Sequence, residues 1–437
     1  MRALCHALIA GVLVVLVGVA FVEPAAAAEG PGVGVPAVVS LGDSAISGEA
    51  GRWAGNTTSK PVSAIDTYGV TSYWDTPTGE AIPGCHRSAS AEIAIGAGVR
   101  SRNLACSGSM TWTWNIDGSI AGQPWKPGLD RISRVVNGEV RSSQLLMLED
   151  YARTHNVKMV VVQVGANDYG FNEVVARCLA NFASSTAWWS PGLGYAGTKN
   201  LCSDDPDMVS RFTQSQQNQR VQQVADALYR VRESMARVGY RPDQWDMVVQ
   251  TYWSPIPRGS GIRYSEGGWT RQSLGGCGLF DADADWLNDT VLTALNNTMR
   301  RARDLVTSGL RFPDDYLPPQ LPLDPIYLLD MEGALVGHRL CEKGVGLLEE
   351  WGLNSWRDQG AVDRLEWVAQ VRTGSALVQP FQPQEGGHAN RFGQYAMRNC
   401  LRQAWNDGAL RSGRCVPAAQ GGVNGFYGEP NMTLAPL

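Results

Sequence analysis

Histidine is scarce in this sequence, and so are motifs for metals or nucleic acids. The 437-residue chain has five histidines, which leaves few candidates for a general base. The formal net charge is −5 with no basic run, which argues against a nucleic-acid partner. No two cysteines form a Cys-x-x-Cys motif, so the common zinc and thioredoxin-type redox motifs are missing. The sequence therefore gives no reason to expect a metal or an organic cofactor.

The N-terminus has the three parts of a secretory signal peptide. Arg2 precedes an apolar run over 7–22, and small residues over 24–28 precede Glu29. The run is shorter than the roughly 20 residues that a membrane span needs, and no later segment is long and apolar enough. Residues 1–28 are therefore predicted to be removed, leaving a secreted protein without a transmembrane segment. An uncleaved membrane anchor is the alternative.

The cysteine count agrees with export. Loss of residues 1–28 removes Cys5 and leaves eight cysteines. An even number in an exported chain favours disulfides, although eight cysteines allow 105 connectivities. Pairing of neighbours along the chain is the simplest of these. It joins Cys85 to Cys106, Cys178 to Cys202, Cys277 to Cys341, and Cys400 to Cys415.

Five short apolar segments are predicted to be strands of a parallel sheet, because continuous β-branched runs are typical of strands buried on both faces. Helical spacing of apolar residues alternates with them, most clearly over 213–238, and this alternation favours a layered α/β domain. Residues 29–437 show no linker and are predicted to form one domain, with long loops fastened by disulfides and a loosely packed tail from about 416. The predicted strands are 36–41, 102–106, 158–164, 246–252 and 325–330, and the other predicted helices are 142–154, 284–306 and 391–405.

Ser44 is the candidate nucleophile. Strand 36–41 runs directly into Gly42-Asp43-Ser44, whose small and turn-forming residues allow a sharp bend. In open α/β sheets ligands bind at the carboxyl ends of the strands. A polar loop after a strand is the alternative interpretation, and the remaining candidate residues argue against it.

A serine nucleophile needs a base, and His388 is the best candidate among the histidines. It lies between flexible glycines and a predicted helix, in Glu385-Gly386-Gly387-His388. Glu385 can accept the other ring N–H, as the third member of a triad does. His155 is interpreted as a surface residue, and His86 and His338 as structural residues near cysteines.

The same sheet edge offers donors for an oxyanion hole. Asn167 follows the clearest strand in Gly165-Ala166-Asn167-Asp168, and its side-chain amide can donate. Gly108 follows strand 102–106 and offers an unobstructed backbone N–H. With the N–H of Ser44, these groups supply three donors around one point.

This ordered set of motifs resembles the SGNH hydrolases, also called GDSL esterases and lipases. The matching pieces are Gly42-Asp43-Ser44, Gly108, Gly165-x-Asn167-Asp168 and Glu385-x-x-His388. Cys85-His86-Arg87-Ser88 and Gly337-His338-Arg339-Leu340-Cys341 resemble the secreted actinobacterial branch. The resemblance implies a three-layer α/β/α sandwich of flavodoxin-like type with a parallel central sheet. It also implies Ser44 as nucleophile, His388 as base, an oxyanion hole from Ser44, Gly108 and Asn167, and no cofactor.

One position departs from the family. The family usually has Asp three residues before the histidine, where this chain has Glu385. Because some relatives orient the histidine with a backbone carbonyl instead, the third member of the triad stays open between that group and Glu385.

Two further features have competing interpretations. Trp112 and Trp114 follow Gly108 closely and are candidates to bind substrate, although tryptophans under long loops often only fill space. Asp281-Ala282-Asp283-Ala284-Asp285 has the alternating carboxylates of a calcium loop. It lacks the glycine and the twelfth-position glutamate of such loops, so no metal site is predicted.

The predicted function is a secreted serine esterase or lipase that cleaves carboxylic esters of lipids or acylated carbohydrates through an acyl-enzyme. One alternative is a carbohydrate esterase that removes acetyl groups from a polysaccharide or the cell envelope. Another is a catalytically idle protein that binds lipid or carbohydrate. A monomer is expected, as the default for a secreted hydrolase.

Overall fold

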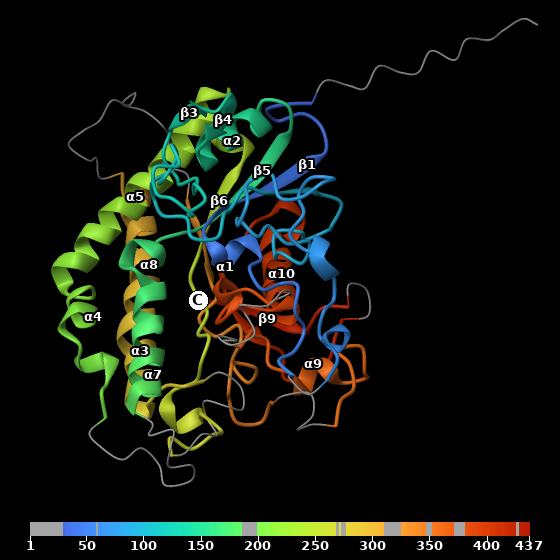
Figure 1. The fold of residues 1–437 in the computed structure, drawn as a ribbon. Coiled ribbons are helices and arrows are strands. Elements are labelled where there is room, and N and C mark those ends of the chain that lie inside the picture. Colours follow the sequence, from blue (N-terminus) through green and yellow to red (C-terminus); the bar gives the residue numbers. More distant parts are fainter. Residues whose placement is uncertain are drawn as a thin grey trace, which may run out of the picture.

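The computed structural model describes residues 29–57, 60–185, 199–267, 271, 277–309, 325–346, 352–370, 381–424 and 428–437. The predicted signal peptide 1–28 lies outside the described residues. The described chain has an α/β fold with a mostly parallel central sheet flanked by helices, which confirms the predicted fold class. Figure 1 shows α5 and α8 side by side against one side of the sheet, and α10 on the other side.

The main sheet has seven strands in the order β2-β1-β5-β6-β7-β8-β9. All neighbouring pairs are parallel except β8 with β9. A separate antiparallel hairpin pairs β3 with β4, and the sequence patterns did not predict it. The strands are β1 (Pro36–Gly42), β2 (Arg100–Asn103), β3 (Ser133–Val136), β4 (Glu139–Ser142), β5 (Asn156–Gln163), β6 (Asp246–Gln250), β7 (Tyr327–Asp330), β8 (Gly413–Pro417) and β9 (Met432–Ala435).

The helices agree closely with the predicted ranges. Predicted helix 213–238 is α5, and 391–405 is α10. The segment 284–306 is interrupted by a π-helical stretch, Leu287–Leu292, between α7 and α8. The helices are α1 (Ser44–Ser47), α2 (Gln144–Ala152), α3 (Phe171–Ser185), α4 (Pro206–Ser210), α5 (Gln214–Arg237), α7 (Asp281–Trp286), α8 (Thr293–Thr307), α9 (Ala361–Arg364) and α10 (Arg391–Trp405). None of these helices, in the part of the chain that the structure describes, has the length and apolarity to cross a bilayer.

The central strands form the core, as their composition predicts. The valines of β1 and of β5 are fully buried, because helices cover both faces of a parallel sheet. Strand β2 differs from its prediction, since pairing covers Arg100–Asn103 rather than 102–106. Cys106 still donates its N–H to the Gly42 carbonyl, so the chain after β2 continues along β1 toward the site.

The tail is not loosely packed, and that prediction is wrong. Strand β9 pairs antiparallel with β8 at the edge of the main sheet, and both strands lie beside α10. Met432 and Leu434 are buried there. Gln403 of α10 also accepts the N–H of Leu434, so the tail is fixed by hydrogen bonds as well as by apolar contacts.

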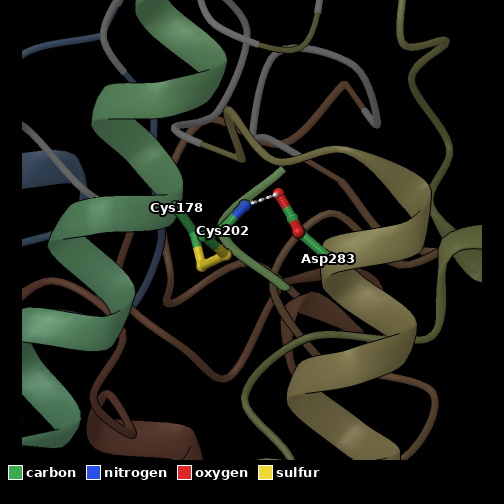
Figure 2. A group of neighbouring side chains, drawn as sticks. All are labelled: Cys178, Cys202 and Asp283. Atoms are coloured by element: carbon green, nitrogen blue, oxygen red, sulfur yellow. Dashed lines mark hydrogen bonds between the residues drawn. A yellow bond between two sulfur atoms is a disulfide. The ribbon is translucent and has the colours of Figure 1, made fainter. Parts of the chain in front are cut away.

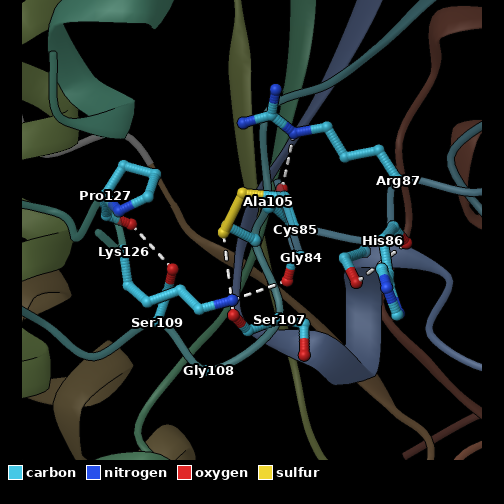
Figure 3. The surroundings of a disulfide bond; sticks show 12 residues. Gly84, Cys85, His86, Arg87, Ala105, Ser107, Gly108, Ser109, Lys126 and Pro127 are labelled. Carbon is cyan, nitrogen blue, oxygen red and sulfur yellow. Dashed lines mark hydrogen bonds between the residues drawn. A yellow bond between two sulfur atoms is a disulfide. The ribbon is translucent and has the colours of Figure 1, made fainter. Parts of the chain in front are cut away.

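All four predicted disulfides are present, which confirms the pairing of neighbours along the chain. Three of them fasten irregular segments, and the fourth ties α10 to β8. Figure 3 shows Cys85–Cys106, which joins the loop before Arg87 to the chain that follows β2. Arg87 donates to the Ala105 carbonyl at 2.8 Å, so the same two segments are joined twice.

The core also holds a carboxyl group that affects stability. Glu92 is fully buried, its Oε1 accepts from Gln250 Nε2 at 2.6 Å, and its Oε2 has no partner among the described residues. Burial raises the pKa of Glu92 from its ordinary 4.5 to about 8. The folded state therefore holds this proton more tightly than the unfolded state, and stability falls as pH rises from 4.5 through about 8.

Glu92→Gln is expected to remove that pH dependence, because the amide carries no titrating proton. At pH 7 the free energy of unfolding is expected to rise by about 3 kcal/mol, whereas near pH 4 the variant and the parent differ little. Urea unfolding of both proteins at the two pH values measures this. An equal difference at both values would show that shape rather than ionisation of Glu92 matters.

Candidate active site

Ser44 lies at the carboxyl end of β1, as the first residue of α1. The turn before it requires glycine at position 42, which has φ +140°. A Cβ there would lie 1.8 Å from the Gln163 carbonyl oxygen of the neighbouring strand β5. Asp43 caps α1, because its Oδ1 accepts the N–H of Ala45 at 3.0 Å. The chain is thus forced to turn where Ser44 leaves the sheet.

Asp43 is fixed by its surroundings. Its Oδ2 accepts from the Tyr252 hydroxyl at 2.6 Å, and its side chain is buried. Burial raises the pKa of Asp43 to about 7, although the hydrogen bonds from Tyr252 and Ala45 oppose the rise. Through these contacts Asp43 stabilises the turn between β1 and α1.

His388 reaches Ser44 from the far end of the chain. Its Nε2 lies 2.7 Å from Ser44 Oγ, which is a hydrogen-bond distance. The sequence motifs predicted these two residues as base and nucleophile. The loop that carries it is tied to its neighbour by Ala369, whose N–H donates to the His388 carbonyl at 2.8 Å. Asn390 then caps α10 by accepting the N–H groups of Phe392 and Gly393.

Burial of the His388 ring favours its uncharged form. Burial lowers the pKa of His388, while the negative charge of Glu49 and the backbone carbonyls of Gly386 and Gln384 oppose this. The ring Nδ1 is buried and has no hydrogen bond of full geometry among the described residues. The lowered pKa favours the uncharged imidazole, and the tautomer with its proton on Nδ1 can act as a base toward Ser44.

Glu385 does not contact His388 as a triad member would. Its Oε1 accepts from the Tyr73 hydroxyl at 2.6 Å, and its Oε2 accepts the N–H of Gln382 at 3.1 Å. The cause is the 3₁₀ turn Pro383–Glu385, in which Glu385 caps the start of its own turn. Spacing of three residues placed Glu385 near His388, but the turn directs its side chain elsewhere.

The three predicted oxyanion donors come from adjoining segments. Among the described residues, the N–H groups of Ser44 and Gly108 have no acceptor. Gly108 adopts φ +79°, which favours glycine. Asn167 begins the 3₁₀ turn after β5 and donates from Nδ2 to the Ser109 carbonyl at 2.8 Å. Its second Nδ2 hydrogen is not used in this bond.

Asn167 and its neighbour also fix the position of the Gly108 loop. Asp168 accepts both the N–H and the hydroxyl of Thr111, at 3.1 and 2.6 Å. On the other side, the Trp114 indole donates to the Gly108 carbonyl at 3.1 Å. These contacts hold the Gly108 loop on both sides and so fix the direction of the Gly108 N–H, the proposed oxyanion donor.

The two tryptophans near Gly108 differ in exposure. Trp114 is half-buried and engaged with Gly108, whereas the Trp112 side chain is 50% exposed. A contact between either ring and a substrate stays a prediction.

Sequence reasoning missed Lys126. Its stem packs along Gly108, where a Cβ would lie 3.3 Å from Lys126 Cε. Its Nζ donates to the Gly84 carbonyl at 2.5 Å beside the disulfide, as Figure 3 shows. Burial lowers the pKa of this ammonium. A lysine in a Trp-Lys-Pro loop carries no sequence signal of burial.

Sequence reasoning also missed the role of Glu49 and assigned His86 only a structural place near a cysteine. The two side chains form a buried pair, with His86 Nδ1 2.6 Å from Glu49 Oε1. A signal did exist, because Glu49 is a single acid among small residues shortly after Ser44.

Within the described residues, one cluster outside this site brings metal-ligating side chains together. Cys178, Cys202 and Asp283 are all buried and close together, as Figure 2 shows. The two sulfur atoms are bonded to each other, and the oxygens of Asp283 accept the N–H groups of Cys202 and Ser203. Each ligand atom is therefore occupied, and Asp283 ties the disulfide loop to α7.

No family profile matches the sequence, and no curated protein matches it. Among solved structures, the chain is similar to an extracellular lipase from Streptomyces rimosus, with 15% identity, a TM-score of 0.37, and coverage of 82% of this chain and 94% of that chain. It is also similar to phospholipase A1 from Streptomyces albidoflavus, with 15% identity, a TM-score of 0.37, and coverage of 86% and 100%. A lipase from a goat rumen metagenome has 11% identity and a TM-score of 0.31, over 86% and 98%. At these TM-scores the likeness carries no argument about activity.

Proposed function

We propose that this chain is a secreted serine ester hydrolase of the SGNH type. It cleaves carboxylic esters of lipids or acylated carbohydrates through an acyl-enzyme on Ser44. His388 is the base, and the N–H groups of Ser44 and Gly108 with the Asn167 amide form the oxyanion hole. The proposed reaction uses water as its second substrate and needs no metal or organic cofactor.

The observation that carries this proposal is the 2.7 Å contact between His388 Nε2 and Ser44 Oγ at the carboxyl end of a parallel strand. A serine hydroxyl is a weak nucleophile unless a base takes its proton. Here a buried imidazole with a lowered pKa stands in hydrogen-bond contact with it. Beside it, the N–H groups of Ser44 and Gly108 have no acceptor in the part of the chain that the structure describes. This combination supports acyl transfer better than binding alone, because a binding protein has no need of the base.

The proposed reaction has two steps, acylation of Ser44 and hydrolysis of the acyl-enzyme. The Ser44 proton passes to His388 Nε2 while Oγ forms a bond to the ester carbonyl carbon, whose π electrons move to the oxygen. The three donors hold this oxyanion. The intermediate collapses as the bond to the alcohol oxygen breaks, and that oxygen takes the proton from Nε2. Water then attacks the acyl carbon while His388 Nε2 takes a water proton. The bond from Ser44 Oγ to the acyl carbon breaks, Oγ takes that proton back from Nε2, and the carboxylic acid leaves.

Hydrolysis of p-nitrophenyl esters from acetate to palmitate tests the proposal and separates its alternatives. Ser44-dependent activity that favours long chains is expected for a lipase. Activity confined to acetate would favour the carbohydrate esterase. Absence of hydrolysis at every length in folded protein, with no labelling by a fluorophosphonate, would leave the idle binding protein.

Glu385→Ala is expected to cost far less activity than loss of Ser44, because the side-chain oxygens of Glu385 accept from Tyr73 and Gln382 and not from the His388 ring. We expect a loss of about tenfold or less in kcat/KM, caused by loosening of the His388 loop. Kinetics of Glu385→Ala beside Tyr73→Phe, which removes the other half of the same hydrogen bond, measure this. A loss equal to that of Ser44→Ala would make Glu385 a full triad member.

A further inference from the structure

A second acid–base pair lies beside Ser44 and His388. Glu49 follows α1 after Gly48, whose left-handed φ of +92° turns the chain. Its side chain is fully buried, with Oε1 2.6 Å from His86 Nδ1, and the His86 side chain is 3% exposed. Both partners are thus removed from solvent, and Glu49 lies only a turn beyond the helix that begins at the nucleophile.

The pair is ionised despite its burial. Burial acts to raise the pKa of Glu49, but the charge of His86 and its hydrogen bond more than offset this and hold the pKa below its usual value. For His86 burial acts in the opposite direction, and the charge of Glu49 raises its pKa overall. A buried carboxylate that stays charged needs such a partner.

His86 and its neighbour Cys85 contact all three segments of the candidate site. The His86 ring packs against the Gln384 side chain, on the loop that carries His388, with Gln384 Nε2 3.0 Å from Nδ1. The His86 backbone carbonyl accepts from Ser47 Oγ of α1 at 3.4 Å. The Cys85 carbonyl accepts the N–H of Ser107, next to Gly108, at 3.0 Å.

Two buried atoms in this cluster, Glu49 Oε2 and His388 Nδ1, make no hydrogen bond of full geometry within the described residues. Ser107 lies close enough to lower the pKa of Glu49, and the carbonyls of Gly386 and Gln384 lie close enough to raise that of His388. The charge of Glu49 acts on His388 nonetheless, and its effect on the pKa of His388 is larger than the opposing effect of His86. The Glu49–His86 pair therefore has a net effect on His388 that favours its protonated form.

We propose that Glu49 is the carboxylate that stabilises protonated His388 during ester cleavage, and that His86 holds Glu49 in place. Glu49 is then a positioning residue in the role that the sequence assigned to Glu385. The inference rests on the proposed function. Its physical basis is that His388 becomes a cation when it takes the Ser44 proton, and a fixed anion in a water-excluded site stabilises that cation.

Three other titratable residues lie near the Glu49–His86 pair: Glu80, Tyr73 and Lys126. Glu80 lies near His86, with its Oε1 3.5 Å from His86 Nε2. Tyr73 stacks on the His86 ring at 4.1 Å and donates to Glu385. Lys126 lies close enough to feel the charges of Glu49 and Glu80. Glu80 is the matched control, because it acts on the same histidine without a resolved effect on His388.

The test is the pH profile of kcat/KM for Glu49→Gln beside Glu80→Gln. Loss of the charge at position 49 is expected to move the acidic limb to lower pH and to lower the plateau by about 10- to 100-fold, because the imidazolium is less stable. Glu80→Gln is expected to keep the acidic limb of the parent, and Glu49→Asp, which restores the charge, to recover it. A Glu49→Gln profile that overlays the parent would overturn the inference while leaving the proposed function intact.

A second measurement does not depend on activity. Titration of the His388 ring followed by NMR, assigned by loss of its signal in His388→Gln, is expected to occur at lower pH in Glu49→Gln than in the parent. This holds even if the parent hydrolyses no ester, which would refute the proposed function separately. If Glu49→Gln does not fold, the same titration in Glu49→Asp and His86→Gln is decisive, and an unmoved His388 titration in His86→Gln would overturn the positioning role of His86.

Discussion

Ser44→Ala is expected to lower kcat/KM for a p-nitrophenyl ester by about 10⁴-fold or more. The reason is geometric, since Ser44 Oγ is the atom that contacts the base, at 2.7 Å from His388 Nε2. Without Oγ no acyl-enzyme can form, and only the oxyanion donors remain to assist water. Kinetics and labelling by a fluorophosphonate probe measure the loss, and the labelled peptide should contain Ser44.

Ser40→Ala is the matched control for this substitution. Ser40 is a fully buried serine of β1, the strand that leads to Ser44, and its hydroxyl donates to Asn103 rather than to any group of the candidate site. We expect its kcat/KM to stay near that of the parent. Fluorophosphonate labelling of Ser44→Ala at the parental rate would move the nucleophile to another residue and would contradict the proposal.

The fold could be predicted from the sequence because its signals are local. The buried parallel strand β5 contains the apolar run Met159–Val162, and α5 has its apolar residues on one face of the helix. The disulfides followed from neighbour order along the chain. Strands β8 and β9 were missed, because each is short and lies in a Gly- and Pro-rich region whose pairing depends on contacts with the sheet edge and α10. Tertiary contact decides such strands, and composition does not.

The site divides in the same way. Motifs at strand ends indicated Ser44, Gly108 and Asn167, because parallel strands bring their carboxyl ends to one edge. Residue spacing does not determine the direction of a side chain. Spacing made Glu385 one of two candidate partners for His388, although a 3₁₀ turn directs its side chain to the N–H of Gln382. The Glu49–His86 pair joins residues 37 positions apart, and no local pattern predicts that contact.

Asn167→Ala is expected to lower kcat by about 10²- to 10³-fold with little change in KM, the usual effect of removing one oxyanion donor. The donor matters mainly when charge develops on the carbonyl oxygen, so the loss should appear in kcat. Steady-state kinetics on one ester measure both constants. A rise in KM with kcat unchanged would place Asn167 in ground-state binding instead.

The difficulty with Asn167 is that it also donates to Ser109 and so helps to hold the Gly108 loop. Thr111→Val separates the two roles, because it removes the hydroxyl contact with Asp168 and loosens the same loop without touching the proposed oxyanion donors. If loop position were the whole effect, Thr111→Val would lose as much kcat as Asn167→Ala. Asn167→Asp sharpens the contrast, since it keeps the shape of the side chain but replaces the donor by an acceptor. A carboxylate facing a developing oxyanion is repulsive, so Asn167→Asp is expected to be slower than Asn167→Ala, an order that a purely structural role does not produce.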